Sequence, residues 1–199
     1  MVDPRPLVRV LGIDPGSRFL GFGVVEARAH VLTHVGSGVL RLDGEAPLSD
    51  RLQQIFLQLG AVLRSFQPAA VAVEGVFTHK NPRSALILGH ARGVALLLAA
   101  QAGVPVYEYA PARVKRSVGA GGNDSKDSVA RMVSTLLRLE APLARADAYD
   151  ALAVALCHLG QVKAGVAAPR KASGGRRSVG GDFAARLTPA VVLPGRVAR

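Results

Sequence analysis

The stretch V-L-G-I-D-P-G-S at residues 10–17 sets the first strand and the first turn of the predicted fold. It belongs to a nearly continuous apolar run from Leu7 to Asp14, interrupted by Arg9, and such a run predicts a buried strand. The P-G-S that follows predicts a turn. Two more strand-like segments, residues 19–25 and 31–40, come after short links. The N-terminal part therefore predicts three strands in an antiparallel meander.

Helical periodicity begins after these strands. Apolar residues recur at steps of three and four from Leu48 to Phe66, as they do on the buried face of an amphipathic helix. The order β-β-β-α-β-α-β-α-α predicts an α/β protein, with a mixed five-stranded sheet flanked by helices. Its later elements are a strand at 69–73, a helix from the Asn81-Pro82 cap to about residue 102, a strand at 104–108, a helix that begins near Asp124 or Ser125, and a helix over about 147–160.

Composition excludes several classes of protein. The 199 residues are 49% hydrophobic, which is enough for one sizeable core. Cys157 is the single cysteine, so an internal disulfide and a zinc site built from cysteines are excluded. The longest stretch without a charged residue, 93–107, has 15 residues, which is too few to span a membrane. With no signal-type apolar segment at the N-terminus either, we expect a cytoplasmic protein.

Charge is unevenly distributed along the chain. The net charge is +11, and residues 163–199 contribute eight basic residues against one acid. This segment is rich in Gly, Ala, Arg, Ser and Pro, so we expect a folded domain at 1–162 and a disordered basic tail at 163–199. A basic excess favours a polyanionic partner, with nucleic acid ahead of an acidic membrane surface. The alternative is a tail that only aids solubility.

Four of the few acidic residues occupy positions typical of a site. Asp14 and Glu74 each end a predicted buried strand, where a side chain can project from the edge of a sheet. Asp147 and Asp150 are three residues apart, so a helix would place both on one face. If the four converge, they suit a hard cation such as Mg²⁺, and a pair of ions would support phosphoryl displacement. The alternative is that each acid only ends or caps its element, and the sequence leaves both open.

Basic and aromatic residues near these acids are candidates for contacts with nucleic acid. A glycine-rich loop at 118–122 leads toward a helix start, where phosphate binds well. An exposed aromatic residue can stack on bases or wedge between them. For each cation the alternative is an ordinary solvated charge, and for the aromatic residue it is a place in the core. The candidates are Phe77, His79, Lys80, Arg83, Arg113, Lys115 and Lys126.

Four blocks of the chain, taken together, resemble the RuvC family of Holliday-junction resolvases. They occur in the same order and with similar spacing as in that family, and they cover most of residues 8–160. The blocks are L-G-I-D-P-G-S-R with G-F-G-V-V (11–25), V-E-G-V-F (73–77), N-P-R-S-A-L-I-L-G-H-A-R-G (81–93) and A-D-A-Y-D-A-L-A (146–153).

The resemblance implies an RNase H-like fold and a Mg²⁺-dependent, structure-specific endonuclease, with Mn²⁺ as an alternative ion and two ions per site. It implies symmetric nicking of two opposed strands of a four-way junction by a homodimer, during recombination and repair, together with the branch-migration proteins RuvA and RuvB. By likeness, Phe77 would intrude at the junction centre, and Lys115 and Lys126 would serve DNA binding or catalysis. The metal-binding catalytic acids would be Asp14, Glu74, Asp147 and Asp150.

One position departs from the family pattern, and two other classes of function compete. Gly75 stands where a larger polar residue, often glutamine, is expected after the glutamate, which affects contacts at the junction centre. An actin-like ATP-binding protein also opens with a strand, an aspartate and a glycine turn, but its two lobes need a longer chain. A non-catalytic DNA-binding module explains the charge but not the four acids.

Overall fold

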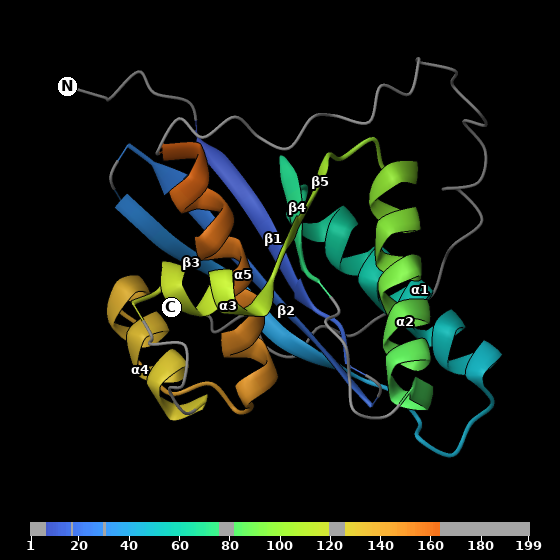
Figure 1. Ribbon diagram of the computed structural model, residues 1–199. Helices are drawn as coiled ribbons and strands as arrows, with labels where there is room; N and C mark the ends of the chain where they lie inside the picture. The colour runs from blue at the N-terminus through green and yellow to red at the C-terminus, as the bar shows by residue number, and fades with distance from the viewer. Residues whose placement is uncertain (1–6, 17, 30, 76–81, 120–125, 164–199) are drawn as a thin grey trace.

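Five strands form one mixed sheet in the order β3-β2-β1-β4-β5 in a computed structural model that describes residues 7–16, 18–29, 31–75, 82–119 and 126–163 (Figure 1). Strands β1, β2 and β3 are antiparallel neighbours, whereas β4 and β5 continue the sheet in parallel with β1. The predicted mixed five-stranded sheet is confirmed. The strand bounds are β1 Val8–Asp14, β2 Phe19–Arg28, β3 Val31–Arg41, β4 Ala70–Glu74 and β5 Val106–Tyr109.

Helices cover both faces of this sheet and give it two hydrophobic cores. Side chains alternate along a strand, so Val10 of β1 packs into the core under α3, α4 and α5, whereas Leu11 and Ile13 pack toward α1 and α2. No described helix combines the length and hydropathy needed to cross a bilayer. The helix bounds are α1 Leu48–Phe66, α2 Pro82–Gln101, α3 Pro111–Ser117, α4 Lys126–Leu137 and α5 Ala146–Lys163.

The structure corrects the predicted elements between β4 and α4. Helix α3 was not predicted, because its seven residues are too few to show a helical period; its signal is Pro111 at the first helical position. Strand β5 begins two residues later than predicted, because the amide of Val104 donates to the carbonyl of Ala99 and so extends the end of α2 instead.

Helix α5 lies unusually close to the sheet. A β-carbon on Gly12 of β1 would come within 2.0 Å of the carbonyl oxygen of Ala151, so only glycine permits this approach. The residues of α5 from Ala151 to Ala155 are almost completely buried. The helix that carries two of the four candidate acids is therefore held firmly against β1.

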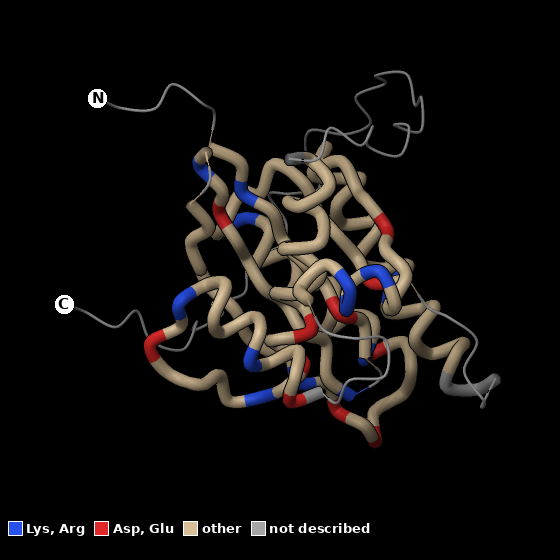
Figure 2. The backbone as a smooth tube through the Cα atoms, turned by 60° about the vertical axis from the view of Figure 1, so that its left-hand side comes forward, with Lys and Arg blue, Asp and Glu red and all other residues tan. Residues whose placement is uncertain are grey.

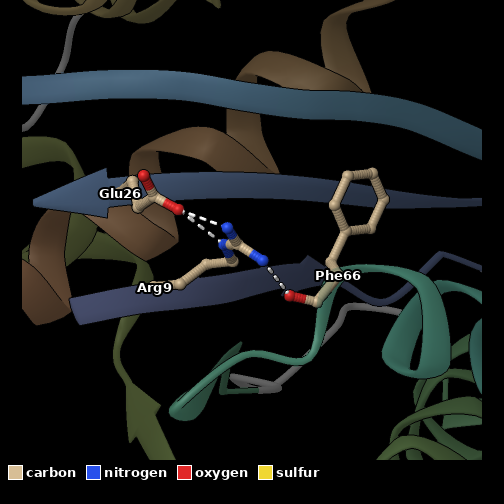
Figure 3. Close-up of polar contacts among 3 residues, drawn as sticks. All are labelled: Arg9, Glu26 and Phe66. Carbon is tan, nitrogen blue, oxygen red and sulfur yellow. Dashed lines mark hydrogen bonds and ion pairs between the residues drawn. The ribbon is translucent and has the colours of Figure 1, made fainter. Parts of the chain in front are cut away.

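One arginine inside the first strand joins three elements. Nε of Arg9 donates to Oε2 of Glu26, its cross-strand neighbour on β2, at 2.8 Å. Its Nη1 donates to the main-chain carbonyl of Phe66 at 2.6 Å, where α1 ends (Figure 3). This explains the single charge within an otherwise apolar strand: the guanidinium satisfies a helix C-terminus and pairs with a carboxylate.

Candidate active site

The four predicted acids line one cleft. Strands β1 and β4 run in parallel with Ile13 beside Val73, so the next residues, Asp14 and Glu74, end adjacent strands at the same edge. Asp147 and Asp150 lie near the start of α5, one turn apart. All four border a cleft of about 520 Å³, to which α2, α3 and α4 also contribute. The structure thus brings together all four acids that the sequence singled out.

A glycine on β2 makes this convergence possible. Gly21 is the cross-strand partner of Asp14. A β-carbon on Gly21 would lie 2.0 Å from the carbonyl oxygen of Asp147. Because glycine has no side chain, the start of α5 packs directly on β2, next to the end of β1.

The environment of the cleft strongly raises the pKa of one of its acids. Burial is the largest of several causes that together raise the pKa of Asp14 to about 8; the others are the charges of Glu74, Asp150 and Asp147 and a side-chain hydrogen bond with Glu74. A hydrogen bond between two carboxyl groups requires that they share a proton. The site therefore concentrates negative charge in a partly buried place, and a cation would relieve that repulsion.

The donor chemistry fits a hard divalent ion. Carboxylate oxygens are the ligands that Mg²⁺ and Mn²⁺ accept, and Mg²⁺ keeps several waters rather than requiring a closed protein cage. Within the described ranges, no three His, Cys, Asp or Glu side chains form a group that could by itself hold a metal ion. The acids border an open cleft, in which water and substrate oxygens can supply further ligands.

Arg145 holds one of the acids in place. Its Nε donates to Oδ2 of Asp147 at 3.0 Å, and its guanidinium carbon lies 3.5 Å from the centre of the Phe19 ring. The aromatic face thus orients the guanidinium, and the guanidinium orients the carboxylate. Neither Arg145 nor Phe19 was predicted as a site residue; the available signal was an arginine two residues before Asp147.

The predicted basic residues have different placements. Lys115 of α3 lines the cleft, together with Arg18, which was not predicted. Arg113 does not line it; its Nη2 donates to Gln161 at 2.6 Å, and its guanidinium lies beside the Tyr109 ring. Acidic and basic segments lie close together in the lower part of Figure 2.

Several predicted DNA-binding residues have side chains outside the described part of the chain. Phe77, His79 and Lys80 lie outside the described residues. Arg83 is in the first turn of α2 and Lys126 begins α4, but their side chains are likewise outside the description.

A histidine near the end of α5 has a structural environment. His158 is buried, and its Nδ1 lies 2.8 Å from the hydroxyl of Tyr109. Burial lowers the pKa of His158, which favours the neutral ring in this hydrogen bond.

Comparison with known proteins identifies the family. The model of the family "Crossover junction endodeoxyribonuclease RuvC" matches residues 10–158. This chain belongs to the RuvC family. A RuvC from Myxococcus xanthus is 61% identical over 188 residues, which are 94% of this chain and 98% of that protein. A RuvC from Tolumonas auensis is 50% identical over 149 residues, 75% of this chain and 85% of the relative.

Solved RuvC structures share the fold. Thermus thermophilus RuvC has a TM-score of 0.73 and 36% identity, covering 82% of this chain and all of that one. The same RuvC in complex with a Holliday junction substrate gives a TM-score of 0.74, 35% identity and the same coverage. The predicted RNase H-like architecture is therefore confirmed. Residues 159–199 lie beyond the range that the family model matches.

The position that departs from the RuvC pattern has room for a side chain. Among the described residues, a β-carbon on Gly75 would meet only the carbonyl of Tyr109, at an ordinary 3.5 Å. The amide of Gly75 donates to that same carbonyl at 2.8 Å. The described part of the fold therefore does not require glycine at this position.

Proposed function

We propose that this RuvC chain resolves Holliday junctions by hydrolysing one phosphodiester bond in each of two opposed strands. The observation that carries the proposal is the convergence of Asp14, Glu74, Asp147 and Asp150 on one cleft, in a chain closely related to named crossover junction endodeoxyribonucleases. Charge repulsion within the cleft favours the binding of a cation. Neither alternative function, an actin-like ATP-binding protein or a non-catalytic DNA-binding module, explains both this cation site and the fold.

The same four carboxylates are the proposed metal ligands and catalytic residues. We propose Mg²⁺ as the ion, with Mn²⁺ as a substitute and two ions per site. When bound, such ions activate a water and stabilise the leaving oxygen of an in-line displacement at phosphorus. A bound cation would relieve the charge repulsion around Asp14, and the hydrogen bond from Arg145 directs the carboxylate of Asp147.

The walls of the cleft supply the substrate contacts. Lys115 and Arg18 place positive charge beside the acids, where a scissile phosphate and its neighbours would lie. In the reaction, a water oxygen forms a bond to phosphorus while the bond from phosphorus to the leaving strand oxygen breaks. Further DNA contacts are proposed for Phe77, His79, Lys80, Arg83, Arg113 and Lys126.

A second copy of the chain is the proposed partner, because one active site serves one strand and a junction presents two symmetric cut points. Helix α2 supports this arrangement: Leu86 and Leu97 are 64% and 53% exposed on it. Added β-carbons at Gly89 and Gly93 would meet no atom of the described residues within 4 Å. Gly89 and Gly93 thus lie on the exposed side of α2 with Leu86 and Leu97, while the other side of α2 packs on α1.

The dimer is tested by sedimentation of Leu97→Glu. A charge on this exposed leucine should convert a dimer to a monomer while the circular dichroism spectrum is retained. Leu136→Glu, on an exposed leucine of α4, is the matched control and should remain a dimer. RuvA and RuvB are proposed as partners from family membership, and the cytoplasm is the proposed location.

The central experiment uses a synthetic four-way junction and a linear duplex of the same sequence, each with Mg²⁺, Mn²⁺ or EDTA. Paired nicks in opposed strands of the junction, and only with metal, are expected. Junction binding without nicks under both metals would support the DNA-binding module instead. A chain that neither binds nor cuts the junction, but is thermally stabilised by ATP, would support the actin-like alternative.

A further inference from the structure

We propose that a groove beside the active-site cleft binds a backbone phosphate of the DNA strand that passes through the cleft. The groove is lined by Phe19, Val39, Arg41 and Arg145 and has a volume of about 400 Å³. The inference rests on the proposed function, because it names where the substrate continues beyond the acids.

The groove and the cleft share a wall. Phe19 lines both of them. Arg41 is the cross-strand partner of Phe19 on β3, so the β2–β3 pair places its cation directly beside the ring. Arg145 approaches the same ring from the segment that precedes α5. A strand with one phosphate at the acids would reach this groove by passing the edge of Phe19.

Arg145 is arranged so that part of its guanidinium faces outward. Its Nε is used by Asp147, and its plane is held over the Phe19 ring, which limits its rotation. Its side chain is nevertheless 45% exposed. Arginine has five N–H donors, so the terminal amino groups can donate to a phosphate while Nε stays on the carboxylate.

Arg41 supplies the second charge of the groove. It is exposed, and among the described residues it takes part in none of the ion pairs. The residues that line the groove include no acid. Two arginines beside one aromatic ring suit a phosphodiester, which accepts hydrogen bonds from several directions and carries one charge per linkage.

Arg41→Ala is the primary test, because Arg41 lines the groove but not the cleft and is not bonded to any of the four acids. The matched control is Arg28→Ala, an exposed arginine at the opposite end of the same β2–β3 pair. Binding of a synthetic four-way junction is measured in EDTA, so that no cleavage occurs, over a series of KCl concentrations.

Loss of one phosphate contact should weaken junction binding and reduce the slope of log K against log salt by about one, for Arg41→Ala but not for Arg28→Ala. In Mg²⁺, Arg41→Ala should raise KM for junction cleavage and leave kcat close to that of the unmodified protein. A folded Arg41→Ala variant with an unchanged affinity and salt slope would overturn the proposal.

The phosphate itself can be located by substrates that carry a single neutral methylphosphonate linkage. One linkage near the cleavage position should weaken binding of the unmodified protein and have little further effect on Arg41→Ala. If every linkage weakens both proteins equally, the groove is not a phosphate site. Junction cleavage by the unmodified protein, measured in parallel, separates failure of this inference from failure of the proposed function.

Discussion

The carbonyl oxygen of Asp147 occupies the place beside β2 where a side chain on Gly21 would begin, 2.0 Å from the β-carbon position. Gly21 is also paired with Asp14. The absence of a side chain on Gly21 thus sets the separation between the end of β1 and the start of α5. It thereby sets the spacing between the candidate metal ligands Asp14 and Asp147.

Gly21→Ala should therefore damage the site more than the fold. The new methyl group must displace the backbone of α5, and overpacking of this kind costs about 1–3 kcal/mol of stability. Misplacement of reacting groups by about 1 Å can lower a rate roughly 100-fold. Junction cleavage and urea unfolding measure the two effects. Gly160→Ala is a glycine-to-alanine change inside α5 where no described atom lies within 4 Å of the added β-carbon; it should leave cleavage unchanged and raise stability by up to about 1 kcal/mol, because alanine favours the helix.

The elevated pKa of Asp14 predicts how stability depends on pH without metal. Its pKa is about 8 in the folded chain against an ordinary value of 3.8, so the folded state holds more protons between these values. The free energy of unfolding should then fall as pH rises from about 4 to 8. Asp14→Asn cannot ionise and should escape this loss.

Thermal unfolding in EDTA checks this directly. At pH 8, the free energy of unfolding of Asp14→Asn should exceed that of the unmodified protein by at least about 1 kcal/mol, which corresponds to roughly 2–4 °C in Tm. The difference should shrink near pH 4, where the aspartate is protonated in the folded state. If Asp14→Asn and the unmodified protein have the same Tm at pH 4 and also at pH 8, the assigned cause of the raised Asp14 pKa is wrong.

Glu74→Gln should abolish cleavage while junction binding survives. The amide retains the shape of the side chain but removes a proposed anionic ligand, and the basic wall with Lys115 is untouched. Nicking in Mg²⁺ and binding in EDTA are measured on the same preparation. Asp50→Asn, a change to an exposed acid in the first turn of α1, provides the control. Full cleavage by Glu74→Gln would remove this residue from the catalytic set.

Arg9→Met should destabilise the fold without changing the chemistry of the cleft. It removes charged hydrogen bonds to Glu26 and to the end of α1, each typically worth about 1.5–3 kcal/mol in well-formed contacts. Partial exposure of both side chains places the expected loss near the lower figure. Urea unfolding measures it, and the control Arg28→Met should change little.

A chain that ends at residue 163 should keep its fold and lose the salt-sensitive part of its DNA affinity. Every described helix and strand lies before that point. The residues removed include far more basic than acidic side chains, and such charge contributes mainly through counterion release. Circular dichroism and junction binding at two salt concentrations are the measurements. Loss of the folded state would show that the removed segment packs on the domain.

Much of the fold follows from local patterns. The apolar runs that end at Asp14 and Glu74, and the amphipathic period of α1, predict their elements because burial on one or two faces leaves a direct record in the order of residues. The order of strands in the sheet does not leave such a record. Only the structure places β4 beside β1, and that pairing brings the two acids to one edge.

The parts of the site that escaped prediction depend on contacts between distant segments. Arg145 acquires its role from Phe19, which is far from it in sequence and adjacent only in the fold. Helix α3, which carries Lys115 to the cleft, is too short for a period to appear. Residue types with ordinary surface roles, arginine above all, reveal a site function only when their neighbours are known.

The packing of α5 against β1, β2 and β4 has a consequence for the protein during its synthesis. Asp14 and Glu74 leave the ribosome well before Asp147 and Asp150, which lie more than 70 residues further along the chain. A nascent chain, or one truncated before α5, holds at most half of the four carboxylates. Synthesis must therefore have passed α5 before the chain carries all four acids, and products that terminate earlier lack two of the proposed metal ligands.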